Sequence, residues 1–207
     1  SGSAQSVNPQ AWNHWYFGPE QAVRFDAEPP TVLNNSQMAA WENAATISDK
    51  EGNLLLYAEG DTVWNGRHEE IGTVSNDTVK SQFSCSAGCA ILRKPGQDSL
   101  YYIFTVPPQG KQGSNDTTYF KYAIVNIKAR GGKGAVIEKD NHVHAYEGVA
   151  GGSTYEKLGF VRHKRKNAWW IVTKKQDESF VAYLFDENGL DPNGVTSDVE
   201  GNSIGYI

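Results

Sequence analysis

The chain has 207 residues, 39% of them hydrophobic and 21% charged, which suits one packed domain and argues against an intrinsically disordered chain. The formal net charge of -5 argues against nucleic acid as a partner, because phosphate-binding proteins carry a basic face. No stretch approaches the roughly 20 consecutive apolar residues of a membrane-spanning helix, so we predict no membrane span.

Residues 1–11 are mostly small and polar. We interpret them as a flexible N-terminal segment, the remnant of either a cleaved signal or an expression tag. The domain is therefore expected to span residues 12–207. Helix-forming patterns are nearly absent from it, and Ser36–Glu42 is predicted to form one helical turn at most.

Strand patterns dominate the rest of the chain. The 21 glycines and an aromatic content of 12% favour short strands joined by tight turns. A first group of three strands is predicted at Ala45–Ser48, Asn53–Ala58 and Asp61–Asn65, with Glu59-Gly60 as a two-residue hairpin link. Two groups of four strands follow, at Ala87–Arg93, Ser99–Val106, Tyr119–Lys128 and Ala135–Lys139, and then at Leu158–His163, Ala168–Thr173, Ser179–Asp186 and Gly194–Val199.

The same order of turn and strand thus returns along the chain. Recurring four-stranded antiparallel units are typical of a β-propeller. A β-sandwich also uses short strands, but it gives no reason for the order to repeat. We therefore predict an all-β, propeller-like fold of about three antiparallel four-stranded blades, with less than about 10% helix.

Several segments carry a resemblance to a known group of proteins. They are, in order, WYFG at 15–18, the stretch at 45–65, AILRKPGQDSLYYIFTV at 90–106, WWIVTKK at 169–175, FVAYLFDENGL at 180–190 and IGYI at 204–207. On these segments the chain resembles the N-terminal propeller-like region of large proteins exported by the type IX secretion system, many of them gliding-motility-associated or bearing a type B sorting domain. The resemblance covers about residues 12–207. It implies an extracellular or outer-membrane location and a fold module rather than a particular activity.

In that family the segment matching Ile204–Ile207 is followed by a further strand and more blades. The resemblance therefore implies an incomplete ring of blades with open edge strands. Backbone groups at such edges pair readily with another strand. We expect contact with the remainder of the same polypeptide, or self-association, through edge strands that include Ser203–Ile207.

Tryptophans supply the candidate ligand-binding residues. Trp12 and Trp41 lie outside the strong strand patterns, and aromatic faces stack on sugar rings. Core packing is the alternative interpretation of both residues.

Four tripeptides consist of Asp, then Ser or Thr, then an apolar residue or Thr. They are similar to the O-glycosylation signal of bacteria with type IX export. Thr78 and Thr117 lie in predicted loops, so they are the candidate modification sites.

The two cysteines, Cys85 and Cys89, are separated by three residues. In an exported protein they would either close a small disulfide loop or remain two thiols. Even with His142 and His144 they do not supply a convincing set of four zinc ligands. We predict no metal and no cofactor.

The five histidines match no nucleophile–base pattern, so no catalytic residue is predicted. The sequence favours a non-enzymatic binding or adhesion module for a protein or glycan ligand at the cell surface. Two alternatives stay open: a propeller-based hydrolase acting on glycans or peptides, and a structural half of a larger assembly.

Overall fold

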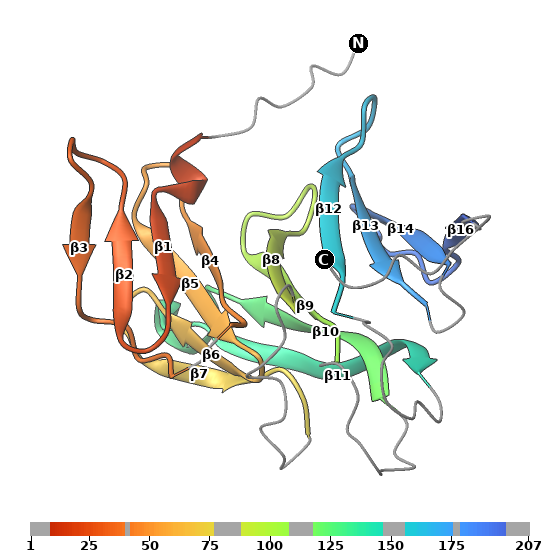
Figure 1. The fold of residues 1–207 in the computed structure, drawn as a ribbon, viewed down its shortest axis with the longest axis horizontal. Coiled ribbons are helices and arrows are strands. Elements are labelled where there is room, and N and C mark those ends of the chain that lie inside the picture. Colours follow the sequence, from red (N-terminus) through yellow and green to blue (C-terminus); the bar gives the residue numbers. More distant parts are fainter. Residues whose placement is uncertain are drawn as a thin grey trace, which may run out of the picture.

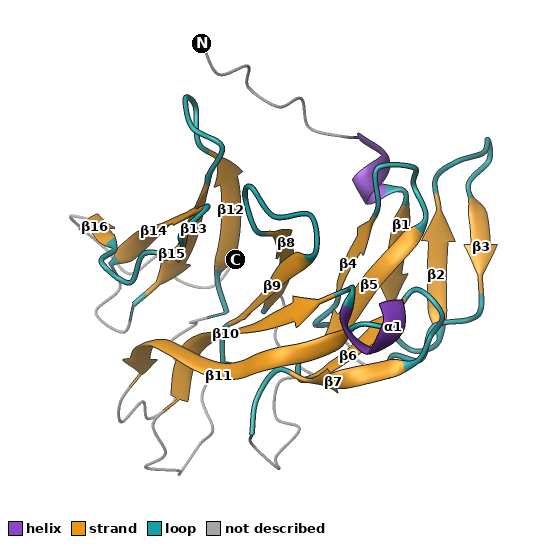
Figure 2. Ribbon diagram, turned by 180° about the vertical axis from the view of Figure 1, so that it is seen from behind, coloured by secondary structure: helices purple, strands orange, loops and turns teal. Residues whose placement is uncertain are grey.

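The computed structural model of the chain describes residues 9–39, 42–76, 88–107, 118–146, 156–175 and 179–197. These residues form four antiparallel sheets and two short helical turns, η1 (Pro9–Trp12) and α1 (Ala129–Gly132) (Figures 1 and 2). The all-β prediction is therefore confirmed. In the described part of the chain, neither helical turn is long or apolar enough to cross a bilayer.

The four sheets follow one another along the chain. The first contains β1 (His14–Phe17), β2 (Gln21–Arg24) and β3 (Thr31–Leu33), and the second contains β4 (Ala45–Ser48), β5 (Leu54–Glu59), β6 (Thr62–Asn65) and β7 (Glu70–Thr73). The third contains β8 (Cys89–Arg93), β9 (Leu100–Thr105), β10 (Thr118–Asn126) and β11 (Ala135–Tyr146). The fourth contains β12 (Leu158–Arg162), β13 (Trp169–Lys174) and β14 (Phe180–Asp186), with β15 (Gly189–Leu190) and β16 (Val195–Ser197) both paired to β14.

Within the first three sheets the spatial order of the strands equals their order in the sequence. The opening strands are neighbours, because β1 contacts β4 and β4 contacts β8. The sheets spread outward from these strands, with the first sheet at the left of Figure 1 and the fourth at the right. None of the four sheets closes on itself.

Two details of the prediction are corrected. There are four sheets rather than about three, because β1, β2 and β3 form a sheet of their own. The hairpin link after β5 is Gly60-Asp61, since Glu59 still pairs with Thr62. Ser36–Glu42 was expected to form one helical turn at most; its described residues, 36–39 and 42, form no helix, and the Ser36 hydroxyl accepts a hydrogen bond from the Met38 amide (3.1 Å).

Each pair of consecutive sheets encloses its own hydrophobic core. Tyr16 packs with Tyr57 and Trp64 between the first and second sheets. Isoleucines and valines, Ile103 among them, fill the space between the second and third sheets. Aromatic side chains, Phe104 among them, fill the space between the third and fourth sheets. A sandwich, in which two sheets share one core, does not describe these residues.

Strand β9 shows how one sheet serves two cores. Successive side chains of a strand point to opposite faces. Tyr101 and Ile103 therefore reach the second sheet, while Tyr102 and Phe104 reach the fourth. Burying a side chain such as Phe104 contributes about 1.5–3 kcal/mol. The continuous apolar run of this strand is thus explained by burial on both faces.

Candidate functional site

A partly exposed aromatic cluster joins the N-terminal helical turn to the fourth sheet. Trp12 of η1 stacks in an offset arrangement on Phe160 of β12, with ring centroids 6.2 Å apart and an interplanar angle of 12°. Phe160 meets Trp169 of β13 edge-on at 6.0 Å. The Arg162 guanidinium lies 4.8 Å from the centroid of the Trp169 ring. We call these four residues the aromatic platform.

Backbone contacts fix the position of Trp12. The Asn13 amide donates to the Gln10 carbonyl (3.1 Å), and the Phe25 amide donates to the Asn13 carbonyl (2.8 Å). The turn between β4 and β5 approaches closely at Gly52, where an added Cβ would lie 2.6 Å from the Asn13 side chain. The positive φ of +87° at Gly52 also favours glycine. The helical turn is therefore held between the first and second sheets.

Strand register fixes the other three members. Phe160 is paired with Ile171, and Arg162 with Trp169, in the hairpin of β12 and β13. Because Ile171 lies in the core shared with the third sheet, Phe160 and Arg162 point to that same side of the fourth sheet. The platform therefore lies on the side of the fourth sheet that faces the third sheet, at the edge of the core between these two sheets.

The exposure of the platform gives it binding capacity. Trp12 and Phe160 keep 36% and 38% of their surface accessible. An aromatic face carries negative potential and attracts cations and polarised C–H groups, and a guanidinium supplies several N–H donors. The platform can therefore contact the ring face of a sugar, or an apolar or cationic side chain of a protein.

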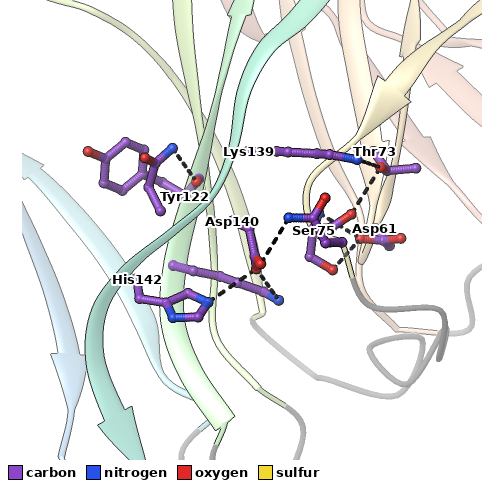
Figure 3. Close-up of polar contacts among 10 residues, drawn as sticks. Asp61, Thr73, Ser75, Tyr122, Lys139, Asp140 and His142 are labelled. Carbon is purple, nitrogen blue, oxygen red and sulfur yellow. Dashed lines mark hydrogen bonds and ion pairs between the residues drawn. The ribbon is translucent and has the colours of Figure 1, made fainter.

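A polar cluster at the seam between the second and third sheets contains a buried charge pair, Lys121 and Asp140. Figure 3 shows Asp140 of β11 at its centre. Asp140 accepts hydrogen bonds from Lys121 (3.3 Å), His142 (3.2 Å) and Asn76 (3.2 Å). Its own amide donates to the Val74 carbonyl at 3.0 Å. Two of these bonds, those with Asn76 and Val74, link β11 to the segment that follows β7, and the bond from Lys121 links β10 to β11.

The charge of this cluster is balanced. Lys121 is almost fully buried, and a buried ammonium needs a close counter-charge. Burial alone would raise the pKa of Asp140, but the Lys121 charge and the hydrogen bonds from His142, Lys121 and Asn76 outweigh it and hold that pKa below its usual value. The ion pair therefore links β10 and β11 within the third sheet, and the same carboxylate holds Asn76 of the segment after β7.

The same seam has a second polar chain. Lys139 donates to the Thr73 hydroxyl at 3.3 Å, and that hydroxyl donates to the Ser75 carbonyl at 3.0 Å (Figure 3). The Ser75 amide and hydroxyl both donate to Asp61, each at 3.0 Å. These bonds satisfy polar groups where the two sheets meet, which favours a structural role.

Two histidines, His68 and His144, link side chains at the boundaries between sheets. His68 hydrogen-bonds to Tyr57 (3.1 Å) and Asn35 (3.0 Å), and Asn35 also accepts from the Tyr16 hydroxyl at 2.9 Å. Burial lowers the pKa of His68. This group closes the edge of the core between the first and second sheets.

His144 is the most strongly perturbed of the histidines. It shares a hydrogen bond of 2.7 Å with the Tyr183 hydroxyl across the third and fourth sheets. Burial, followed by the nearby Lys175 charge, lowers the pKa of His144 to about 4. Burial also raises the pKa of Tyr183 to about 12. Both groups are therefore neutral at pH 7 and join two sheets by a neutral bond.

The structure describes only part of the predicted site set. Trp12 lies in the aromatic platform, and its binding role stays a prediction. Trp41, Thr78, Thr117 and Cys85 lie outside the described residues, as do Ser203–Ile207. Cys89 begins β8 and packs against the core between the second and third sheets. The disulfide between Cys85 and Cys89 stays a prediction.

Sequence reasoning did not find Phe160, Arg162 and Trp169. A usable signal was present, because residues two apart in β12 share a face and the hairpin brings Trp169 beside Arg162. The contact with Trp12 had no such signal, since it joins distant parts of the chain. Within the described ranges, no group of three or more His, Cys, Asp or Glu side chains is placed to hold a metal ion.

Comparison with known proteins gives no relative. No protein-family model, no curated protein and no solved structure matches the chain.

Proposed function

We propose that the chain is a non-enzymatic binding module, and that its ligand is a glycan held on the aromatic platform. The observation that carries this proposal is the offset stack of Trp12 on Phe160, with Arg162 over Trp169 beside it. Flat, partly exposed rings suit the face of a sugar, and the Arg162 donors suit its hydroxyl groups. A protein ligand is the other outcome that the test distinguishes.

We further propose that the four sheets are propeller-like blades. Three features support this: the contacts among the opening strands β1, β4 and β8, the outward order of the strands, and a separate core between consecutive sheets. In such an arrangement the opening strands face the centre. The platform, built on β12 and the turn before β1, would then lie on the central side.

The location at a cell surface and the type IX export route are also proposed, and they rest on the sequence resemblance alone. Treatment of intact cells with protease, followed by detection of the chain, tests the location. Cleavage of the protein in intact cells is the expected result. Full protection until the cells are lysed would contradict it.

A glycan array followed by calorimetric titration tests the ligand. We expect the wild-type chain to select a set of glycans, and Trp12→Ala to weaken their binding at least about tenfold, or about 1.4 kcal/mol. Ile137→Ala is the control, because Ile137 is an exposed apolar residue of β11 that lies outside the platform. Its affinity should equal that of the wild type.

Two results would contradict the glycan assignment. One is equal weakening of glycan binding by Trp12→Ala and Ile137→Ala, which would mean that the platform is not the glycan-binding surface. The other is an array without selective binding, together with a protein ligand whose affinity falls in Trp12→Ala. That second result would keep the platform and replace the ligand class.

A further inference from the structure

The outward face of the first sheet is apolar and exposed. Trp15, Val23 and Val32 are aligned across β1, β2 and β3, and Trp15 meets Phe25 edge-on at 5.2 Å. Trp15 is 57% exposed and Val32 is 69% exposed. We call Trp15, Phe17, Val23, Phe25 and Val32 the first end face. Contiguous apolar surfaces of this kind mark interaction sites.

The fourth sheet has a comparable outward face. Two rows of paired residues cross it, Val161–Trp170–Leu184 and Val172–Ala182–Val195. They alternate along their strands with Ile171 and Val181, which are buried against the third sheet. Val161 is 56% exposed and Val195 is 65% exposed. We call these six residues the second end face.

The two end faces stand in the same relation as the faces already joined inside the chain. In each internal contact, the face that one sheet turns toward the following sheet in the chain packs against the face that the following sheet turns back toward it. The first end face is on the side of the first sheet where a preceding sheet would lie, because Tyr16 and Ala22 on the opposite side pack against the second sheet. The second end face is on the side of the fourth sheet where a following sheet would lie. Contact between them would continue the existing series of sheets.

Charge at the rims favours the same pairing. The loop between β2 and β3 carries Asp26 and Glu28, and Arg24 at the end of β2 is already bonded to Asp26. The loop after β12 reads HKRK at 163–166, with three cations and no carboxylate. Figure 1 shows the loop between β2 and β3 and the loop between β12 and β13 on the same side of the molecule, at the top of the view. An acidic rim would therefore meet a basic rim.

We propose that a second copy of this chain docks head-to-tail, with the first end face of each copy on the second end face of the other. Two copies related by a two-fold axis make this contact twice, and the two equivalent contacts close the assembly as a dimer. This goes beyond the binding function proposed above. It also differs from the edge-strand pairing expected from the sequence, because side chains of whole faces, rather than backbone edges, make the contact.

Light scattering coupled to size-exclusion chromatography tests the assembly at micromolar concentration. The wild-type chain should have about twice the monomer mass of 22.8 kDa. Val32→Glu on the first end face and Val161→Glu on the second should each be monomeric, because each variant loses one half of both contacts. Both positions are well exposed, so circular dichroism should show a native fold for each variant.

Mixing the two variants separates a head-to-tail contact from a face-to-itself contact. Each variant keeps the face that the other lacks, so an equimolar mixture should form a dimer through one intact interface. Ile137→Glu is the matched control, since Ile137 is an exposed apolar residue of β11 outside both end faces, and it should remain dimeric. Raising the salt from about 0.1 M to about 1 M should shift the dimer toward monomer, since exposed charges are then screened.

Three results would overturn the proposal. The first is a wild-type chain that is monomeric over the whole concentration range. The end faces would then not bind a second copy of the chain. The second is a variant, Val32→Glu or Val161→Glu, that dimerises as well as the wild type. The third is a mixture of the two variants that stays monomeric. The glycan titration does not depend on any of these results, so failure of one proposal is distinguishable from failure of the other.

Discussion

The two middle sheets and the two end sheets differ in how many faces they cover. The second and third sheets bury both faces, as the alternating side chains of β5 and β9 show. The first and fourth sheets bury one face and expose the other. Yet apolar side chains populate both faces of all four. An apolar face of a sheet is therefore suited to packing, but it is buried only where a neighbouring sheet lies against it.

The middle of the molecule is also where buried charge occurs. Lys121 and Asp140 are bonded in the seam between the second and third sheets. The Arg24–Asp26 pair beside the first sheet, in contrast, is exposed. Exposed pairs contribute little, while breaking a buried one is costly. Stability should thus depend on the middle sheets far more than on the end faces.

The largest difference is expected for matched phenylalanine deletions. Phe104→Ala empties a fully buried site between the third and fourth sheets and should lower the free energy of unfolding by about 3–5 kcal/mol. Phe25→Ala, on the first end face, should change it by less than about 1 kcal/mol, because that ring is already exposed. Urea denaturation of both variants measures the difference. Similar losses would mean that the core between the third and fourth sheets is not closed.

A smaller effect is expected for the seam. Asp140→Asn leaves the buried Lys121 ammonium without its carboxylate and should cost about 2 kcal/mol at pH 7. Asp98→Asn is the matched control, since Asp98 pairs with Arg93 at the surface, and it should cost less than about 0.5 kcal/mol. Thermal and urea unfolding measure both. Equal costs would show that the seam pair is no stronger than a surface pair.

The smallest effect concerns pH. The pKa of His144 is about 4 in the folded chain against 6.5 as its ordinary value, so between these pH values a proton binds the unfolded chain in preference. The free energy of unfolding should therefore fall as the pH is lowered through this window. One proton contributes at most about 1.4 kcal/mol per pH unit, and residual solvent contact of the ring reduces that value.

His144→Gln should make this fall shallower. Tyr183→Phe should leave it nearly unchanged, because burial, rather than the hydrogen bond to Tyr183, is the main cause of the low pKa. Urea denaturation at pH 4.5, 5.5 and 6.5, values chosen within the titration window, measures the slope. A His144→Gln slope identical to that of the wild type would contradict this assignment.

Strands with strong apolar runs were predictable from the sequence. β5, β9, β13 and β14 match their expected ranges closely, because burial on one or both faces demands continuous or alternating apolar residues. The first sheet was missed for a physical reason. Its strands have only three or four residues and are separated by Pro19, Pro29 and Pro30, so local patterns indicate turns there. Pairing along the whole hairpin, rather than local propensity, stabilises them.

The platform was predictable only in part. Trp12 was singled out because it lies outside the strong strand patterns, and the structure places it on an accessible surface. Its neighbours Phe160 and Trp169 come from the fourth sheet, and no local rule connects them to the N-terminal turn. Likewise, the sequence does not predict which sheet faces are covered and which are exposed, since this depends on which sheets are neighbours.

Adjacent residues of β1 offer the most direct test of that distinction. Tyr16 points into the core, where it stacks on Tyr57 at 4.8 Å, and Trp15 points outward onto the first end face. We expect Tyr16→Ala to lower the free energy of unfolding by about 3 kcal/mol, and Trp15→Ala to lower it by less than about 1 kcal/mol in dilute solution. Urea denaturation followed by circular dichroism compares the two. A Trp15→Ala loss equal to or larger than that of Tyr16→Ala would contradict the arrangement of covered and open faces described above.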